Sequence, residues 1–238
     1  MINIGILKAD SVMPDLQADH GDYSDMFEHL LTGVGEDVRV SVYDVEQGNY
    51  PDSIDDCSGY LITGSKRSVY EDEPWIVTLG QFVRTLHQRK KKLVGICFGH
   101  QLVAQELGGK TEKSARGWGV GRHDTELLID LGTDGLAGTH FGLLSRHQDQ
   151  VSRLPEGGRV LAASDFCPIA GMLVEDHILT FQGHPEFGVG YARDLLDIRR
   201  TAVGEEKFLK AVDSFSQAPD QQRVAGWIID FIAGSAHR

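Results

Sequence analysis

The sequence has few cysteines and no long apolar run. Its 238 residues contain three cysteines, Cys57, Cys97 and Cys167, an odd and widely spaced set that argues against a disulfide framework and favours a reducing compartment. No uninterrupted apolar stretch reaches the roughly 18 residues that a membrane span needs. The N-terminus also lacks the basic segment and apolar core of a secretion signal. We therefore expect a cytoplasmic protein with no membrane partner.

Positive charge is also scarce. Lysine and arginine total 23 against 35 aspartates and glutamates, a net charge of -12. Nucleic acids and anionic membranes require a positive binding face, so we expect no nucleic-acid partner. Internal repeats, low-complexity segments and a Pro/Ser-rich linker are missing as well. We therefore interpret residues 1–238 as a single domain.

The first half of the chain alternates short apolar runs with amphipathic segments. The pattern predicts strands at 2–7, 38–45, 56–65 and 92–97, and helices at 24–33, 74–90 and 100–107. Such alternation is typical of an α/β fold in which helices cover both faces of a mostly parallel sheet.

From about residue 118 the pattern changes. Short strand-like runs punctuated by glycine and aspartate follow one another with little helix between them. We interpret them as an antiparallel extension that leads the chain back to the sheet. Helices are predicted near 189–201, 204–215 and 219–233. The fold class is therefore α/β with three layers, a mostly parallel central sheet flanked by helices, and an antiparallel extension.

A cysteine stands where the strand at 92–97 turns into the next helix. In Gly95-Ile96-Cys97-Phe98-Gly99, the two glycines permit the tight strand–turn–helix of a nucleophile elbow. The dipole of the following helix favours a thiolate, and the N–H of Phe98 is placed to face an oxyanion. Free cysteine is also a common core residue, so this motif alone leaves a packing role open.

A second motif supplies the partners that a cysteine nucleophile needs. A strand-like run ends at Gly183 and is followed by His184, Pro185 and Glu186. Proline keeps the preceding histidine out of the helical region, and residues two apart in extended backbone point the same way. Glu186 is thereby predicted to orient the imidazole, which would act as the base for Cys97.

Together these motifs resemble those of the class I glutamine amidotransferases. The sequence GICFGHQ at 95–101 is followed by HPE 87 residues after Cys97. Matching segments occur at 2–7, 117–121, 145–151 and 166–176. The likeness covers nearly the whole chain and is closest to the glutaminase domain of GMP synthase and its free-standing homologues. The resemblance implies a flavodoxin-like sheet and a catalytic triad of Cys97, His184 and Glu186.

The resemblance also implies further site residues. Backbone N–H groups of Phe98 and Gly64 would form the oxyanion hole, with Ser65 beside the substrate. The family often has Gly-Gly-Pro where this chain has Gly64-Ser65-Lys66, which leaves the course of this loop open. The amino-acid end of the substrate would be held by Gln101, Gln148 and Asp149. For His100 and His147, structural and chemical roles both remain open.

The function implied by the resemblance is hydrolysis of the side-chain amide of L-glutamine. The reaction would release ammonia through a γ-glutamyl thioester, without a cofactor, and a separate synthetase subunit would supply any acceptor. One alternative is a γ-glutamyl hydrolase or peptidase with the same triad. A less favoured alternative is a metal-binding or non-catalytic regulatory protein, because the histidines and cysteines lack a short zinc-type pair such as CxxC or HExxH.

Overall fold

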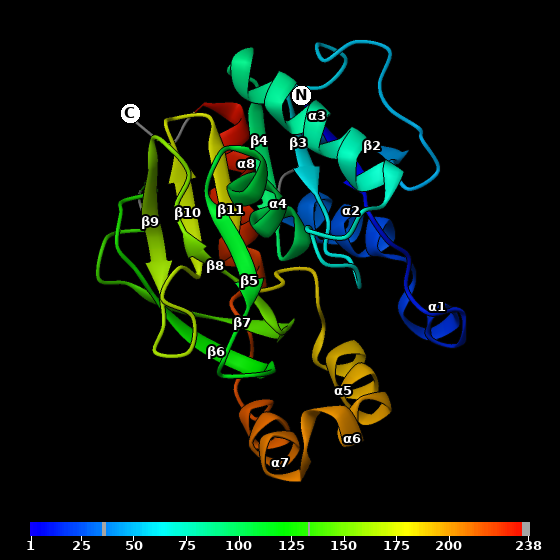
Figure 1. Ribbon diagram of the computed structural model, residues 1–238, viewed down its shortest axis with the longest axis vertical. Helices are drawn as coiled ribbons and strands as arrows, with labels where there is room; N and C mark the ends of the chain where they lie inside the picture. The colour runs from blue at the N-terminus through cyan, green and yellow to red at the C-terminus, as the bar shows by residue number, and fades with distance from the viewer. Residues whose placement is uncertain (35–36, 133, 235–238) are drawn as a thin grey trace.

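The computed structural model describes residues 1–34, 37–132 and 134–234, and its centre is a nine-stranded sheet (Figure 1). In sheet order the strands are β2 (Val38–Asp44), β1 (Ile2–Lys8), β3 (Gly59–Ile62), β4 (Lys92–Ile96), β11 (Ile178–Phe181), β10 (Gly171–Val174), β9 (Gly158–Ala163), β6 (Gly119–Leu127) and β7 (His140–His147). The strands from β2 to β11 run parallel. From β11 to β7 every neighbouring pair is antiparallel. The carboxyl ends of β3, β4 and β11 therefore meet at one edge.

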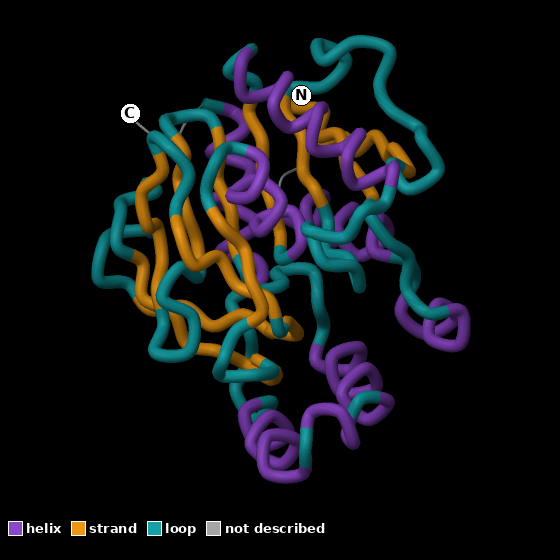
Figure 2. Tube along the Cα trace, viewed as in Figure 1, coloured by secondary structure: helices purple, strands orange, loops and turns teal. Residues whose placement is uncertain are grey.

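Helices cover both faces of the parallel half. The helices are α1 (Pro14–His20), α2 (Tyr23–Val34), α3 (Pro74–Gln88), α4 (Phe98–Glu106), α5 (Val189–Ile198), α6 (Arg200–Val203), α7 (Glu205–Ser214) and α8 (Gln221–Ala233). Apolar side chains of α2 and α8 pack on one face of the sheet, and those of α3 and α4 pack on the other. Figure 2 shows α5, α6 and α7 gathered beside the antiparallel strands, away from the parallel half.

The predicted fold class is confirmed, with three differences in detail. A short helix, α1, was not predicted, because its seven residues have no buried side chain and hence no apolar period. The third strand is limited to Gly59–Ile62, since the residues before it form turns. The run at 145–151 is divided at Gln148 between β7 and β8 (Asp149–Arg153), and β8 pairs with β5 (Lys110–Lys113) in a separate two-stranded sheet.

Within the described ranges, every helix is too short or too polar to cross a lipid bilayer.

Candidate functional site

Cys97 occupies a strained corner between β4 and α4. Its φ of 51° and ψ of -97° lie in a region that residues with a side chain seldom adopt, at a cost of about 1–3 kcal/mol. The flanking glycines make the corner possible: a Cβ on Gly95 would lie 2.7 Å from the carbonyl carbon of Gly99, and one on Gly99 would lie 2.7 Å from the carbonyl oxygen of Ile62. Strand and helix thus approach too closely for any larger residue.

His184 is fixed from three sides on the loop after β11. Its backbone N–H donates a hydrogen bond of 2.8 Å to the carbonyl of Leu144 on β7. Its Nδ1–H donates to Oε1 of Glu186, also at 2.8 Å. The ring of Phe187 stacks on the imidazole with 3.8 Å between centroids and 8° between planes. The imidazole therefore has one orientation, with Nδ1 engaged by Glu186 and Nε2 on the opposite side of the ring.

Charge outweighs burial at His184. The imidazole is 3% exposed and Glu186 is 5% exposed. Burial lowers the pKa of His184, but its interactions with Glu186 and Cys97 raise it, and the net effect is a raised pKa. The arrangement thus favours a protonated imidazole next to Cys97 at neutral pH.

The loop after β3 passes directly against this pair. A Cβ on Gly64 would lie 2.8 Å from Cε1 of His184 and 3.7 Å from Cβ of Cys97. The loop is anchored by Asp10, a carboxylate 4% exposed that accepts from the backbone N–H of Lys66 at 2.8 Å and from its Nζ at 2.9 Å. The course of the Gly64-Ser65-Lys66 segment, which the sequence left open, is therefore set by a residue just after β1.

Gly64→Ala is expected to reduce kcat/KM by about 10²-fold or more, because the added methyl group must displace the imidazole. For this variant, turnover of a γ-glutamyl substrate and the midpoint of thermal unfolding are measured together. Gly33→Ala is the matched control: it lies in α2, and its Cβ would meet nothing within 4 Å, so activity should be unchanged. Full activity of Gly64→Ala would contradict the close packing of this loop on His184.

Gln101 joins two of the other predicted residues. Its Nε2 donates to the backbone carbonyl of Asp149 at 2.8 Å and to Oε1 of Gln182 at 3.1 Å. Both amide hydrogens are engaged, which leaves Oε1 of Gln101 as an acceptor. The carboxylate of Asp149 is tied to the β3–α3 loop, where it accepts from the hydroxyls of Ser68 at 2.5 Å and Tyr70 at 3.1 Å. Asp149 therefore links the two sides of the site.

Two predicted residues are engaged in hydrogen bonds within the protein. Oγ of Ser65 accepts from the backbone N–H of Arg67 at 3.2 Å, so the hydroxyl stabilises the turn of its own loop. The carbonyl of Gln148 accepts from the N–H of Ser114 at 2.9 Å, at the junction of β7 and β8. Their predicted contacts with the substrate remain predictions.

Buried histidines surround the site without carrying charge. His100 is fully buried, with its Nδ1 2.7 Å from Oγ1 of Thr180, and Nδ1 of His147 donates to the carbonyl of Asp149 at 3.1 Å. Burial lowers the pKa of each imidazole to about 3. Both rings are therefore neutral at physiological pH and support the geometry of α4, β8 and β11.

Ligand-type side chains converge elsewhere in the described ranges. Glu175, Asp176 and His177 place one potential ligand atom each within 4.8 Å of the others. They lie on the turn between β10 and β11, at the opposite end of β11 from His184. Among the described residues, no such group forms around Cys97.

A cysteine at a strand–turn–helix corner, with a buried histidine–carboxylate pair from the neighbouring parallel strand, defines a class of α/β hydrolytic proteins. The family model "Glutamine amidotransferase class-I" matches residues 19–196 of this chain. The chain therefore belongs to the class I glutamine amidotransferase family, which confirms the family predicted from the motifs.

Individual relatives differ in how much of their length is shared. The chain is 32% identical over 226 residues to gamma-glutamyl peptidase 2 of Arabidopsis thaliana, covering 90% of this chain and 89% of that protein. It is 36% identical over 152 residues to the GMP synthase of Clostridium novyi, covering 61% of this chain and 26% of the synthase. A crystal structure of a glutamine amidotransferase from Thermotoga maritima has the same fold, with a TM-score of 0.77 at 15% identity, covering 100% of this chain and 99% of that one.

Proposed function

We propose that this protein hydrolyses γ-glutamyl amide bonds through a thioester on Cys97. The thiolate attacks the γ-carbonyl carbon, and the N–H groups of Gly64 and Phe98 hold the resulting oxyanion. The imidazolium of His184 gives its proton to the leaving nitrogen, and the carbon–nitrogen bond breaks. His184 then takes a proton from water, which attacks the thioester and releases glutamate. Glu186 keeps the ring in the required tautomer throughout.

The observation that carries this proposal is the positioning of the imidazole. Its Nδ1 is held by Glu186 at 2.8 Å, and a Cβ on Gly64 would lie 2.8 Å from its Cε1 while 3.7 Å from Cβ of Cys97. Nucleophile, imidazole and loop therefore surround one small volume. A core cysteine would have no need of a strained backbone or of a buried ion pair beside it.

The contacts of Gln101 indicate which end of the substrate the protein holds. They favour the amino-acid end of a γ-glutamyl group. Its Oε1 is free to accept from the α-ammonium, while its amide is held by the carbonyl of Asp149. Ser65, Gln148 and Asp149 would complete this end with backbone groups. A γ-glutamyl moiety is thereby held with its γ-carbon over Cys97, whatever the leaving group is.

The leaving group is proposed to be a peptide. The similarity to a gamma-glutamyl peptidase extends over 89% of that relative, whereas the similarity to a GMP synthase is confined to 26% of that protein. Glutamine is the second candidate, supported by the family itself. If glutamine is the substrate, a separate synthetase subunit would use the ammonia.

Incubation with a γ-glutamyl dipeptide and, separately, with glutamine tests the choice. We expect kcat/KM for the peptide to exceed that for glutamine by about tenfold or more, since contacts to the leaving group stabilise only the larger substrate. Glutamate release is measured for both, and ammonia for glutamine. Equal rates, or a preference for glutamine, would contradict a peptide substrate while leaving the γ-glutamyl chemistry intact.

A further inference from the structure

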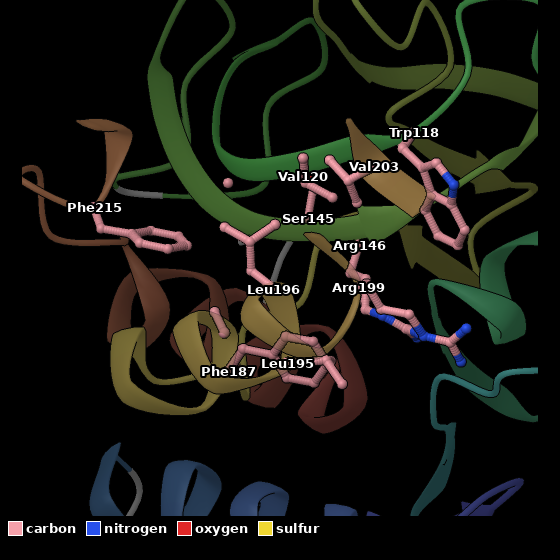
Figure 3. A pocket seen from close by; sticks show the side chains of 12 residues that line it. Trp118, Val120, Ser145, Arg146, Phe187, Leu195, Leu196, Arg199, Val203 and Phe215 are labelled. Atoms are coloured by element: carbon pink, nitrogen blue, oxygen red, sulfur yellow. The ribbon is translucent and has the colours of Figure 1, made fainter. Parts of the chain in front are cut away.

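A narrow cleft lies beside the site, between the β6–β7 hairpin and helices α5, α6 and α7. Its enclosed space is about 10 Å³, close to that of one water molecule, and its walls include Trp118, Arg146, Phe187, Leu195, Arg199 and Phe215. Figure 3 shows the two arginines near Trp118 on one side of the cleft and Phe215 on the other. The cleft is therefore apolar at one end and cationic at the other.

This cleft shares a wall with the catalytic imidazole. Phe187 stacks on His184 and also lines the cleft, so the same ring borders both the imidazole and the cleft. Leu144 forms a β-bridge with His184, and Arg146 follows two residues later on β7. Residues two apart in a strand share a face and are separated by about 6.6 Å. The backbone of Arg146 thus lies about the length of two peptide residues along β7 from Leu144, the residue that pairs with His184.

Arg146 has no charged partner in the described part of the chain. Its Nε is buried and makes no hydrogen bond with any described residue. Arg122 is similarly half-buried, but it pairs with the carboxylates of Asp124 and Asp220. The Arg146 guanidinium instead lies 5.8 Å from the ring of Trp118, an arrangement that orients its plane. A half-buried guanidinium without an anion is destabilising, and a carboxylate from a ligand would satisfy it by a bidentate contact.

We propose that Arg146 binds the C-terminal carboxylate of the peptide leaving group, and so selects γ-glutamyl peptides with a free C-terminus. This inference rests on the proposed function. Two peptide residues span about 7 Å, which matches the offset of Arg146 along β7 from the residue paired with His184. Trp118 holds the guanidinium in place, and Arg199, exposed at the same mouth, adds positive charge.

The test compares γ-glutamyl-alanyl-glycine with its C-terminal amide. For the wild-type protein, kcat/KM should be about 10- to 100-fold higher for the free acid, mainly through KM. Arg146→Gln should remove this preference by lowering kcat/KM for the acid and leaving that for the amide unchanged. Arg146→Lys should retain part of it, since a lysine keeps the charge but not the planar fork. Arg159→Gln, an exposed arginine on β9, is the control and should change nothing.

Binding measured without turnover tests carboxylate recognition by Arg146 separately from hydrolysis. In the Cys97→Ala background, the free acid should bind about tenfold or more tightly than the amide, and Arg146→Gln should abolish the difference. Cleavage of acid and amide at equal rates, or an equal loss for both in Arg146→Gln, would overturn carboxylate recognition while the hydrolase proposal stands. Failure of the wild type to cleave either peptide would overturn the proposed function. In that case, equal binding of the free acid and the amide would still overturn carboxylate recognition by Arg146.

Discussion

Cys97→Ala is expected to abolish hydrolysis of γ-glutamyl substrates, with kcat reduced by about 10⁴-fold or more. Removing the nucleophile of a triad leaves only binding and oxyanion stabilisation, and losses of about 10⁶-fold are known for such changes. Turnover is measured by glutamate release. Acid-quenched wild-type protein should also carry one γ-glutamyl group on the peptide that contains Cys97, and the variant should carry none.

Cys167→Ala is the matched control for this result. Cys167 is also buried, at 3% exposed, but burial raises the pKa of its thiol to about 12, so it is protonated and unreactive at neutral pH. We expect Cys167→Ala to keep its activity and Cys97→Ala to keep its thermal midpoint. Substantial turnover by Cys97→Ala, or a γ-glutamyl group attached to another residue, would contradict the thioester mechanism.

The parts of the site that the sequence predicts are local. The corner at Cys97 is encoded within five residues, because the glycines on either side are required by contacts of 2.7 Å. The pairing of His184 with Glu186 is likewise encoded in three residues, since the proline between them restricts the backbone. The alternation of apolar runs predicts the parallel half of the sheet for the same reason: each strand and helix carries its own period.

Contacts between distant segments could not be predicted. Asp10 anchors the loop of Gly64 from 56 residues away, through the backbone and Nζ of Lys66, and nothing in the sequence near either residue indicates the pairing. The stacking of Phe187 on His184 depends on how the chain turns after β11. Arg146 lies in the family-matching segment at 145–151, yet the sequence does not show that its guanidinium lacks a charged partner among the described residues, because that depends on which side chains surround it in three dimensions.

The pH dependence of Glu186→Gln should reveal how the charge of the imidazole is maintained. In the wild type, burial lowers the pKa of His184, and interactions with Glu186 and Cys97 raise it further than burial lowers it. Neutralising Glu186 weakens one of these interactions, so the pKa of His184 should fall. Because the imidazolium must donate a proton to the leaving nitrogen, activity is lost as pH rises through this pKa. The alkaline limb of kcat/KM should therefore move to lower pH in the variant.

The size of the effect distinguishes charge from geometry. A glutamine oxygen still accepts from Nδ1–H, so the ring keeps its place, yet kcat is expected to fall by about 10²- to 10⁴-fold, as it does when a triad carboxylate is neutralised. Glu175→Gln, exposed on the distant β10–β11 turn, is the control and should leave the profile unchanged. A fall in kcat without movement of the alkaline limb would mean that Glu186 only positions the ring. Movement of the limb together with the fall would mean that its charge keeps His184 protonated, and that the buried pair serves proton transfer.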